Sequence, residues 1–467
     1  MTDPTTDHDP RPPYPDVLSM IGNTPMVEVK SLDTGPCRLF LKLESQNPGG
    51  SIKDRIALSM IEAAEREGRI KPGGTIIEAT AGNTGLGLAL VAAQKGYKMK
   101  LIIPDKMSQD KIFHLKALGA DVTMTRSDVG KGHPEYYQDM AERIQKETPN
   151  SIWVDQFSNP ANPEAHVKTT GPEIWAQMGH ELDAVVCGVG SGGTISGLGR
   201  YFGQVAPHVR MVLADPDGSV VGEASQTGKV PEEVGSWLVE GIGEDFIPPN
   251  CDLSLIADAV YVSDRDAFHA ARELVLKEGI LGGSSTGTLL AGALAWCRRQ
   301  TEPKRVVSFV CDTGNKYLSK VYNDAWMVDN GLMELESHGD LRDLVVRRAD
   351  RGQLVTCKTS ETLATAYGRM RMFDVSQVPV TDADGKLVGL VDESDVMLAA
   401  HQNPDAFQAS VADHMVQNLE VVSPEQSLDD LLPLFQADKV AIVMAGDRLF
   451  GLITKVDFIN HLRRRGR

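Results

Sequence analysis

Short apolar runs alternate with helical patterns from about residue 15 to residue 330, and this alternation restricts the fold more than any other feature. The runs TIIEA, MKLIIPD and RVVSFVCD are apolar and bounded by turn residues, which is typical of strands buried on both faces. In SIKDRIALSMIEAAEREG, the residues Ile56, Met60, Ala63 and Ala64 share one helix face. The sequence therefore predicts an α/β fold with mostly parallel sheets and helices on both faces.

From His338 onward, two segments resemble each other, and each is consistent with strand, turn, helix, strand, turn, strand and helix. KLVGLVDESD in the first aligns with RLFGLITKVD in the second, so that Gly389 corresponds to Gly451. This internal duplication predicts a tandem-repeat module of α/β units. The predicted boundaries are a flexible N-terminal tail over residues 1–14, a first domain over 15–330, a linker over 331–337, and repeats over 338–400 and 409–465.

The composition disfavours several classes of protein. A net charge of −17 disfavours binding to nucleic acid or to an anionic membrane. The six cysteines include no Cys-x-x-Cys pair, so free thiols are expected rather than a disulfide framework or a metal site. The N-terminus lacks the charged and apolar segments of a secretory signal, and no apolar run is long enough to span a bilayer. We expect a soluble cytoplasmic protein.

The stretch GVGSGGTISG follows an apolar run and opens a helical pattern. Its closely spaced glycines allow backbone N–H groups and a helix N-terminus to surround an anion such as a phosphate. The spacing of Gly188, Gly190 and Gly193 also fits the dinucleotide fingerprint, with Asp215 as the acidic residue further on. A nicotinamide site, another phosphate-bearing ligand and a tight turn without ligand therefore remain open for this motif.

Two further turns combine small and polar residues before a helix. In TAGNTG, the side chains of Thr80, Asn83 and Thr84 suit a carboxylate or a ring hydroxyl, although the same residue types are typical helix caps. In GGSSTGT, Ser284 or Ser285 is either an N-cap or a neutral hydroxyl that faces a ligand ring.

The stretch QNPGGSIKDR places Lys53 after a Pro-Gly-Gly turn, without the Gly-Lys-Ser/Thr order of a phosphate loop. Lys53 is either a solvated surface lysine or an amine kept neutral by burial and by the helix N-terminus. A neutral lysine amine can form a Schiff base with an aldehyde. A pyridoxal 5′-phosphate site would use this lysine, the glycine loop, the asparagine and the serine together.

These motifs resemble a known family. IGNTPMV, NPGGSIKDR, ATAGNTG, GVGSGGTISG, VEGIGEDFIP and GGSSTGT are similar, in this order and over residues 15–330, to the fold-type II pyridoxal-phosphate β-family. The duplicated tail resembles a Bateman module, a regulatory unit for adenosine-type ligands. The resemblance implies two α/β subdomains in the catalytic domain, pyridoxal 5′-phosphate as cofactor, and a homodimer or a larger homo-oligomer.

The resemblance also implies roles for individual residues. Lys53 would be the catalytic residue and would carry the cofactor, which would also contact Asn83, Gly190, Ser191, Gly192, Gly193, Thr194 and Ser285. The substrate would contact Thr80, Ala81, Gly82, Thr84, Gln156 and Gly241. In the tail, a nucleoside would contact Thr454 and Asp457, whereas Asp392 replaces the threonine of the other repeat and Asp395 remains. The alternative is that Asp395 and Asp457 only cap helices.

The reaction implied is a β-replacement that joins L-serine and L-homocysteine into L-cystathionine and water through an aminoacrylate, a step of transsulfuration and cysteine biosynthesis. The Bateman module favours this reaction over the alternative, cysteine synthesis from O-acetylserine and sulfide. A third hypothesis is an adenosine-ligand sensor with a degenerate enzyme domain. The cofactor lysine, the asparagine, the glycine loop and the serine are all retained, which argues against the sensor.

Several positions depart from the family pattern. Ala81 stands where the family often has serine, and Phe157 and Glu244 stand where animal enzymes have tyrosine. The haem-binding extension of animal enzymes requires an N-terminal cysteine and histidine. Here the first cysteine is Cys37, and only His8 precedes it. The haem-free type of bacteria is therefore expected.

Overall fold

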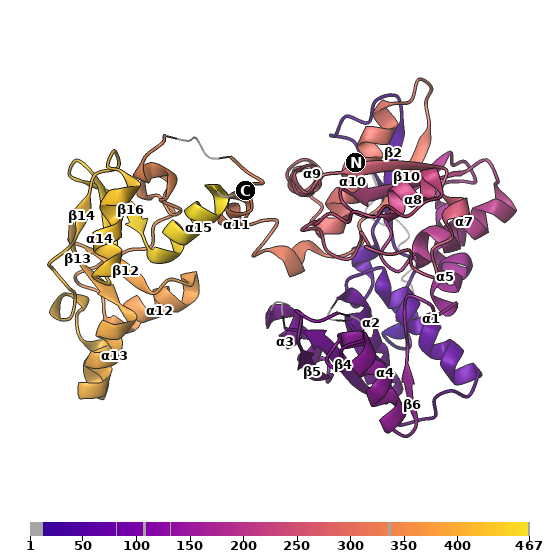
Figure 1. Cartoon of the computed structure of the whole chain (residues 1–467), viewed down its shortest axis with the longest axis horizontal. Helices are drawn as coiled ribbons and strands as arrows, with labels where there is room; N and C mark the ends of the chain where they lie inside the picture. Colours follow the sequence, from indigo (N-terminus) through magenta and orange to yellow (C-terminus); the bar gives the residue numbers. More distant parts are fainter. Residues whose placement is uncertain (1–12, 81, 106–108, 131, 335–337, 466–467) are drawn as a thin grey trace, which may run out of the picture. The chain divides into compact units, whose positions relative to one another are not determined.

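The computed structural model describes residues 13–80, 82–105, 109–130, 132–334 and 338–465, and the chain divides into two compact units after Asn323 (Figure 1). Residues 324–330, grouped with the first domain in the sequence analysis, are part of the second unit. Most of the expected tail and part of the expected linker lie outside the described residues. No helix in the described ranges has the length and apolar character needed to cross a membrane.

The larger sheet of the first unit has six strands in the order β1-β2-β10-β7-β8-β9. Its strands are β1 (Met26–Glu28), β2 (Arg38–Lys42), β7 (Ala184–Cys187), β8 (Arg210–Pro216), β9 (Asp258–Val262) and β10 (Arg305–Phe309). All neighbouring strands are parallel except β1 and β2. The prediction of a mostly parallel sheet is therefore confirmed for this part of the chain.

The smaller sheet has four parallel strands in the order β5-β4-β3-β6. Its strands are β3 (Thr75–Glu78), β4 (Lys98–Pro104), β5 (Asp121–Thr125) and β6 (Ser151–Trp153). Successive side chains of β3 point to opposite faces of the sheet. Ile76 packs in a core with residues of two helices on one face, whereas Ile77 packs with Ala141 on the other. This sheet is therefore covered on both faces, as the apolar strands predict.

The helices of the first unit connect these strands. They are α1 (Lys53–Arg66), α2 (Asn83–Lys95), α3 (Gln109–Ala117), α4 (Tyr137–Glu147), α5 (Ala161–Ala165), α6 (Gly171–Gln177), α7 (Gly193–Val205), α8 (Val221–Thr227), α9 (Asp264–Glu278) and α10 (Ser284–Arg298), with a π-helical turn at His166–Thr170. Local sequence sets their ends. The Ser263 side chain accepts from Asp266 N–H at the start of α9, and Gly279, with φ +72°, ends that helix.

The second unit contains two three-stranded sheets of the same topology. They are formed by β11 (Cys357–Lys358), β12 (Gln377–Thr381) and β13 (Leu387–Asp392), and by β14 (Val421–Val422), β15 (Ala441–Ala445) and β16 (Arg448–Ile453). In each sheet the first pair is parallel and the second antiparallel. The helices are α11 (Asp324–Asp329), α12 (Leu363–Phe373), α13 (Glu393–Gln402), α14 (Leu432–Gln436) and α15 (Lys455–Arg465). The predicted tandem-repeat module is confirmed.

The two corresponding glycines have equivalent surroundings. A Cβ at Gly389 would collide with the Met415 side chain, and a Cβ at Gly451 would collide with Val345. Met415 lies at the start of the second repeat, before β14, and Val345 lies at the start of the first, before β11. The glycine of each repeat thus packs against the N-terminal segment of the other repeat, which explains why both positions are glycine.

Candidate functional site

A cavity of about 490 Å³ in the first unit gathers the site residues predicted from the sequence. It is lined by Lys53, Thr80, Gly82, Asn83, Thr84, Gln156, Gly190, Ser191, Gly192, Gly193, Thr194, Gly241 and Ser285. Ala81 lies outside the described residues. Gly241 lies in the long segment after α8, and the others follow the carboxyl ends of β3 and β6 in one sheet and of β7 in the other, or begin α1 and α10. Ligand sites of parallel sheets form at such ends.

Lys53 is the first residue of α1 and is held by the turn before it. Asp54 accepts a hydrogen bond from Gly49 N–H at 2.6 Å, and Ile52 N–H donates to the Cys311 carbonyl at 2.9 Å. Among the described residues, the Lys53 amine forms no hydrogen bond or ion pair. Burial lowers the pKa of Lys53, against the opposing effect of Cys311. The solvated-surface interpretation of this lysine does not fit these surroundings.

The glycine positions of the loop at the start of α7 leave no room for a Cβ. Gly192 has φ +81°, and a Cβ there would lie 2.6 Å from the Cβ of Cys251. A Cβ at Gly190 would collide with the Gly241 carbonyl, and one at Gly193 would collide with the Asn162 side chain. The backbone N–H groups of this loop and the helix N-terminus therefore offer an anion site without intervening side chains.

Two buried residues that the sequence analysis missed hold the side chains of this loop. Asn162 donates to Ser191 Oγ at 2.8 Å, and it also donates to the Gln156 carbonyl at 2.7 Å. His166 shares a 3.2 Å hydrogen bond with Thr194 Oγ1. Burial, reinforced by nearby positive charges, lowers the pKa of His166 well below its usual value, so its ring is neutral. Both residues lie in a helical stretch with no glycine or motif to reveal them.

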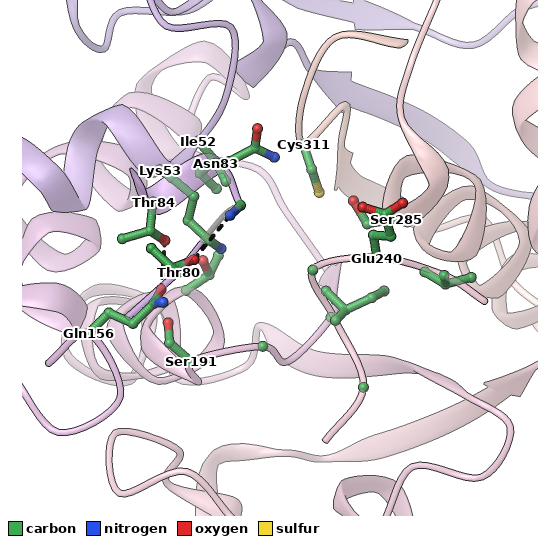
Figure 2. Close-up of a pocket in the computed structure, with 18 of the residues that line it drawn as sticks. Ile52, Lys53, Thr80, Asn83, Thr84, Gln156, Ser191, Glu240, Ser285 and Cys311 are labelled. Carbon is green, nitrogen blue, oxygen red and sulfur yellow. Dashed lines mark hydrogen bonds between the residues drawn. The ribbon is translucent and has the colours of Figure 1, made fainter. Parts of the chain in front are cut away.

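Asn83 and Ser285 lie on opposite sides of the cavity (Figure 2). Asn83 donates to Asp312 at 2.7 Å, and its amide oxygen accepts from Lys316 at 2.7 Å. Burial raises the pKa of Cys311, beside Ser285, to about 12, so the thiol is protonated at neutral pH. The role of this segment, CDTGNKY, was not recognised from the sequence. Its position after an apolar strand was a usable signal, because ligand sites form at the carboxyl ends of parallel strands.

The loop between β3 and α2 meets the end of β6 through Thr84, whose hydroxyl donates to Gln156 Oε1 at 2.6 Å. Thr80 Oγ1 accepts from Gly82 N–H at 3.1 Å, which is the local capping contact expected of this residue type. Asn250 fixes Gln156 from the other side by donating to its carbonyl at 3.0 Å. Capping and cavity lining are thus both present in this loop.

Asp215, the acidic residue of the dinucleotide fingerprint, does not line the cavity. It is buried at the end of β8, and its Oδ2 accepts from Gly222 N–H at 2.7 Å. Burial raises the pKa of Asp215 to about 6. The fingerprint therefore fits by spacing alone, and a nicotinamide site gains no support from the structure.

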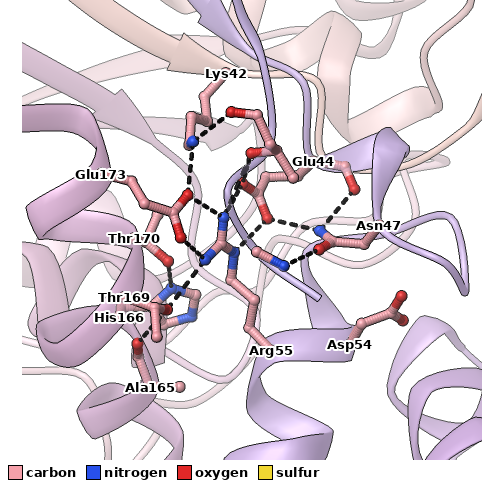
Figure 3. Close-up of polar contacts among 12 residues, drawn as sticks. Lys42, Glu44, Asn47, Asp54, Arg55, Ala165, His166, Thr169, Thr170 and Glu173 are labelled. Carbon is pink, nitrogen blue, oxygen red and sulfur yellow. Dashed lines mark hydrogen bonds and ion pairs between the residues drawn. The ribbon is translucent and has the colours of Figure 1, made fainter. Parts of the chain in front are cut away.

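A buried ion-pair network surrounds Arg55, which follows Lys53 by two residues in α1 (Figure 3). Arg55 donates to Glu44 at 2.7 and 2.8 Å and to both oxygens of Glu173 at 2.7 Å. Lys42 also donates to Glu173 at 2.7 Å. Burial lowers the pKa of Lys42 despite this pairing. The network joins α1 to α6 and so fixes the start of the helix that carries Lys53.

In the second unit, the two residues of the predicted nucleoside site bond to each other. Thr454 N–H donates to Asp457 Oδ2 at 2.8 Å, and the Thr454 hydroxyl donates to the same oxygen at 2.6 Å. In the other repeat, Asp392 and Asp395 form a reciprocal capping box at the start of α13. The structure thus contains the helix caps of the alternative interpretation, and the nucleoside site stays a prediction.

Comparisons with known proteins agree with this architecture. The family model "Pyridoxal-phosphate dependent enzyme" matches residues 17–312, and the CBS domain model matches residues 342–402 and 411–464. The chain belongs to the family of pyridoxal-phosphate dependent enzymes. Relatives that align with nearly the whole chain include proteins named cystathionine β-synthase. The protein of that name from Dictyostelium discoideum is 35% identical over 96% of this chain and 92% of its own length.

Further relatives differ in how much of the chain they cover. The cystathionine β-synthase of Saccharomyces cerevisiae is 33% identical over 96% of this chain and 97% of its own length. Cysteine synthase 1 of Emericella nidulans is 40% identical but covers 67% of this chain and 85% of its own length. A hydrogen sulfide-producing enzyme from Fusobacterium nucleatum is 37% identical with a TM-score of 0.61, over 65% of this chain and 100% of that structure.

Proposed function

We propose that the protein replaces the β-hydroxyl of L-serine with the thiol of L-homocysteine, giving L-cystathionine and water. The observation that carries this proposal is the cavity in which a lysine of lowered pKa faces a glycine loop able to hold a phosphate. The residues present fit pyridoxal 5′-phosphate, the cofactor of the family, because the loop has no space for a Cβ at its three glycines and the Lys53 amine has no partner among the described residues.

In this proposal, Gly190 to Thr194 hold the cofactor phosphate, Asn83 binds the ring hydroxyl and Ser285 meets the ring nitrogen. The bound cofactor supplies an electron sink for negative charge that develops at the substrate Cα. Lys316 and Asp312 fix the Asn83 amide, so its orientation is set before any ligand arrives. Ser285 is a neutral group, and a neutral partner does not keep the ring nitrogen protonated as a carboxylate would.

Lys53 is the proposed general base. Burial lowers the pKa of Lys53, which favours the neutral amine that this role requires for accepting a proton from the serine Cα. The backbone of the loop from Thr80 to Thr84, with Gln156, holds the serine carboxylate, and Gly241 faces the amine. The hydroxyl leaves Cβ with a proton as water, and the acceptor thiol takes its place.

The choice of homocysteine rests on domain content. Relatives named cystathionine β-synthase align with both units of this chain, whereas the cysteine synthase relatives cover only about the first two thirds. Cysteine synthesis from O-acetylserine and sulfide is the alternative, because the catalytic unit is about as similar to those enzymes.

We further propose that the CBS repeats bind an adenosine-type effector through Thr454 and Asp457. CBS domains commonly bind such ligands, which supports the proposal. Calorimetry with S-adenosylmethionine and with adenine nucleotides tests it, and absence of heat with all of them would contradict it. A homodimer or larger homo-oligomer and the absence of haem stay predictions, which light scattering and the absorption spectrum test. A cytoplasmic location is proposed from the six free cysteines of the described chain.

The experiment that tests the reaction type is Lys53→Ala, with Lys168→Ala as a matched control whose side chain is 64% exposed. The purified Lys53→Ala protein is expected to lack the visible absorbance of lysine-bound cofactor and to form no cystathionine. The control is expected to keep both. Full activity of Lys53→Ala would contradict the assignment.

A further inference from the structure

Glu244 is a carboxyl group of the cavity that the proposed reaction does not use. It lies in the loop between Gly241 and Phe246, and its backbone is held on both sides. Gly243 N–H donates to the Val189 carbonyl at 2.8 Å, Val220 N–H donates to the Glu244 carbonyl at 3.0 Å, and Glu244 N–H donates to Ser219 Oγ at 3.2 Å. The position of this side chain at the cavity wall is therefore built into the loop.

The other charged residues of the cavity wall, apart from the reactive Lys53, already have partners. Lys316 donates to Asn83, and Glu240 pairs with Lys320 at 2.7 Å. The Glu244 carboxyl, by contrast, forms no hydrogen bond or ion pair with any described residue. Burial and repulsion from Asp245 raise the pKa of Glu244 to about 8, against the opposing charge of Lys53. A cation bound beside a half-buried carboxyl group stabilises its ionised form. The unpartnered carboxyl group of Glu244 therefore favours a cationic ligand.

The charges of the donor substrate are accounted for elsewhere in the proposed site. The loop from Thr80 to Thr84 would bind the serine carboxylate, and the cofactor, when present, would bind the serine nitrogen. A remaining cation must therefore come from the second substrate. Sulfide carries no cationic group, whereas an amino-acid thiol carries an ammonium group.

We propose that Glu244 binds the α-ammonium group of the thiol acceptor, and hence that the acceptor is an amino-acid thiol. This inference rests on the proposed function, which it deepens by assigning acceptor specificity to one residue. Phe157 and Trp237 line the same cavity, and the Phe157 ring lies 5.5 Å from that of Phe246. These rings offer apolar surface to the carbon chain of the acceptor, next to the carboxylate that takes its charge.

The test compares L-homocysteine, L-cysteine, 4-mercaptobutanoate and sulfide as acceptors, with L-serine as donor, in the holoenzyme and in its Glu244→Gln variant. L-homocysteine and L-cysteine carry the ammonium group, and 4-mercaptobutanoate is homocysteine without it. The wild type is expected to prefer homocysteine over 4-mercaptobutanoate about tenfold or more in kcat/KM, as for one charge-assisted hydrogen bond. In Glu244→Gln, the KM for homocysteine is expected to rise about tenfold with little change in kcat, so that the preference is lost.

Glu233→Gln is the matched control, since it neutralises an exposed carboxyl of the same segment after α8 that does not line the cavity. It is expected to keep the preference of the wild type. An equal preference for homocysteine in wild type and Glu244→Gln would overturn the role of Glu244 while leaving the proposed function intact. A Glu244→Gln variant whose only change is tighter cofactor retention would also overturn the role of Glu244. This result would mean that the wild-type carboxylate lies close to the cofactor phosphate and repels it. Use of sulfide without use of homocysteine or cysteine would overturn both proposals.

Discussion

Replacing Glu173 by glutamine removes one negative charge from the buried network around Arg55. The Lys42 and Arg55 side chains in this network are 0% and 1% exposed, and that of Glu173 is 13% exposed. In the wild type, two cations face two anions, Glu44 and Glu173. In Glu173→Gln, one positive charge stays buried without compensation, and the amide can replace only part of the three hydrogen bonds that Glu173 accepts.

The expected loss in the free energy of unfolding follows from the pKa of Glu173. Burial alone would raise this pKa, but the hydrogen bonds and charge of Arg55, with those of Lys42, hold it at about 2, against 4.5 for an unperturbed glutamate. This difference corresponds to a stabilisation of about 3 kcal/mol at neutral pH. Breaking a buried ion pair by removing one partner costs about 3–5 kcal/mol, which agrees. Because the folded pKa is depressed, this stability is present above about pH 4.5 and is lost as pH falls toward 2.

The assay is urea unfolding of wild type and variant at pH 7, with Glu142→Gln as a matched control. Glu142 forms an exposed ion pair with Lys146 at 2.6 Å on α4. The Glu173→Gln variant is expected to lose about 3 kcal/mol, and the control at most about 0.5 kcal/mol. The difference between Glu173→Gln and wild type should narrow below pH 4.5. A loss below about 1 kcal/mol for Glu173→Gln, or one equal to that of the control, would refute the reasoning.

Two other predictions concern the cofactor loop and a buried carboxyl. Gly192→Ala forces a Cβ against Cys251 at φ +81° and should weaken cofactor retention in dialysis, whereas Gly203→Ala on the same helix meets open space and should add about 0.5–1 kcal/mol of stability. Cofactor retained equally by both variants would contradict this. Burial raises the pKa of Glu78 to about 7, so wild-type stability relative to Glu78→Gln should fall by about 3 kcal/mol as pH rises from about 4.5 to 7 in unfolding experiments. A difference independent of pH would show that Glu78 titrates normally.

The parts of the fold that follow from local pattern were predictable. Apolar runs followed by helical patterns predicted the parallel sheets. The motifs after those runs predicted a site at the ends of the strands. The structure adds strands to the apolar runs named in the sequence analysis, among them β1, β6 and β9. β1 and β6 have only three residues each, and their assignment depends on hydrogen bonds to strands distant in the sequence.

The cavity wall was predictable where a motif marked it and not elsewhere. Asn162 and His166 support the glycine loop from positions about 30 residues earlier, through contacts that only the folded chain creates. The position of Glu244 was noted from the sequence as a departure from related enzymes, but its lack of a partner emerges only from the packing around it. Asp215 shows the opposite case, because its spacing fits a motif while its side chain caps a helix away from the cavity.

The most direct test of the central claim is a paired assay of the purified wild-type protein. One reaction contains L-serine and L-homocysteine, the other contains O-acetylserine and sulfide, and the products are identified by mass. We predict that cystathionine forms from serine and homocysteine with a higher kcat/KM than cysteine forms from O-acetylserine and sulfide. Cysteine as the preferred product, with little or no cystathionine, would contradict it.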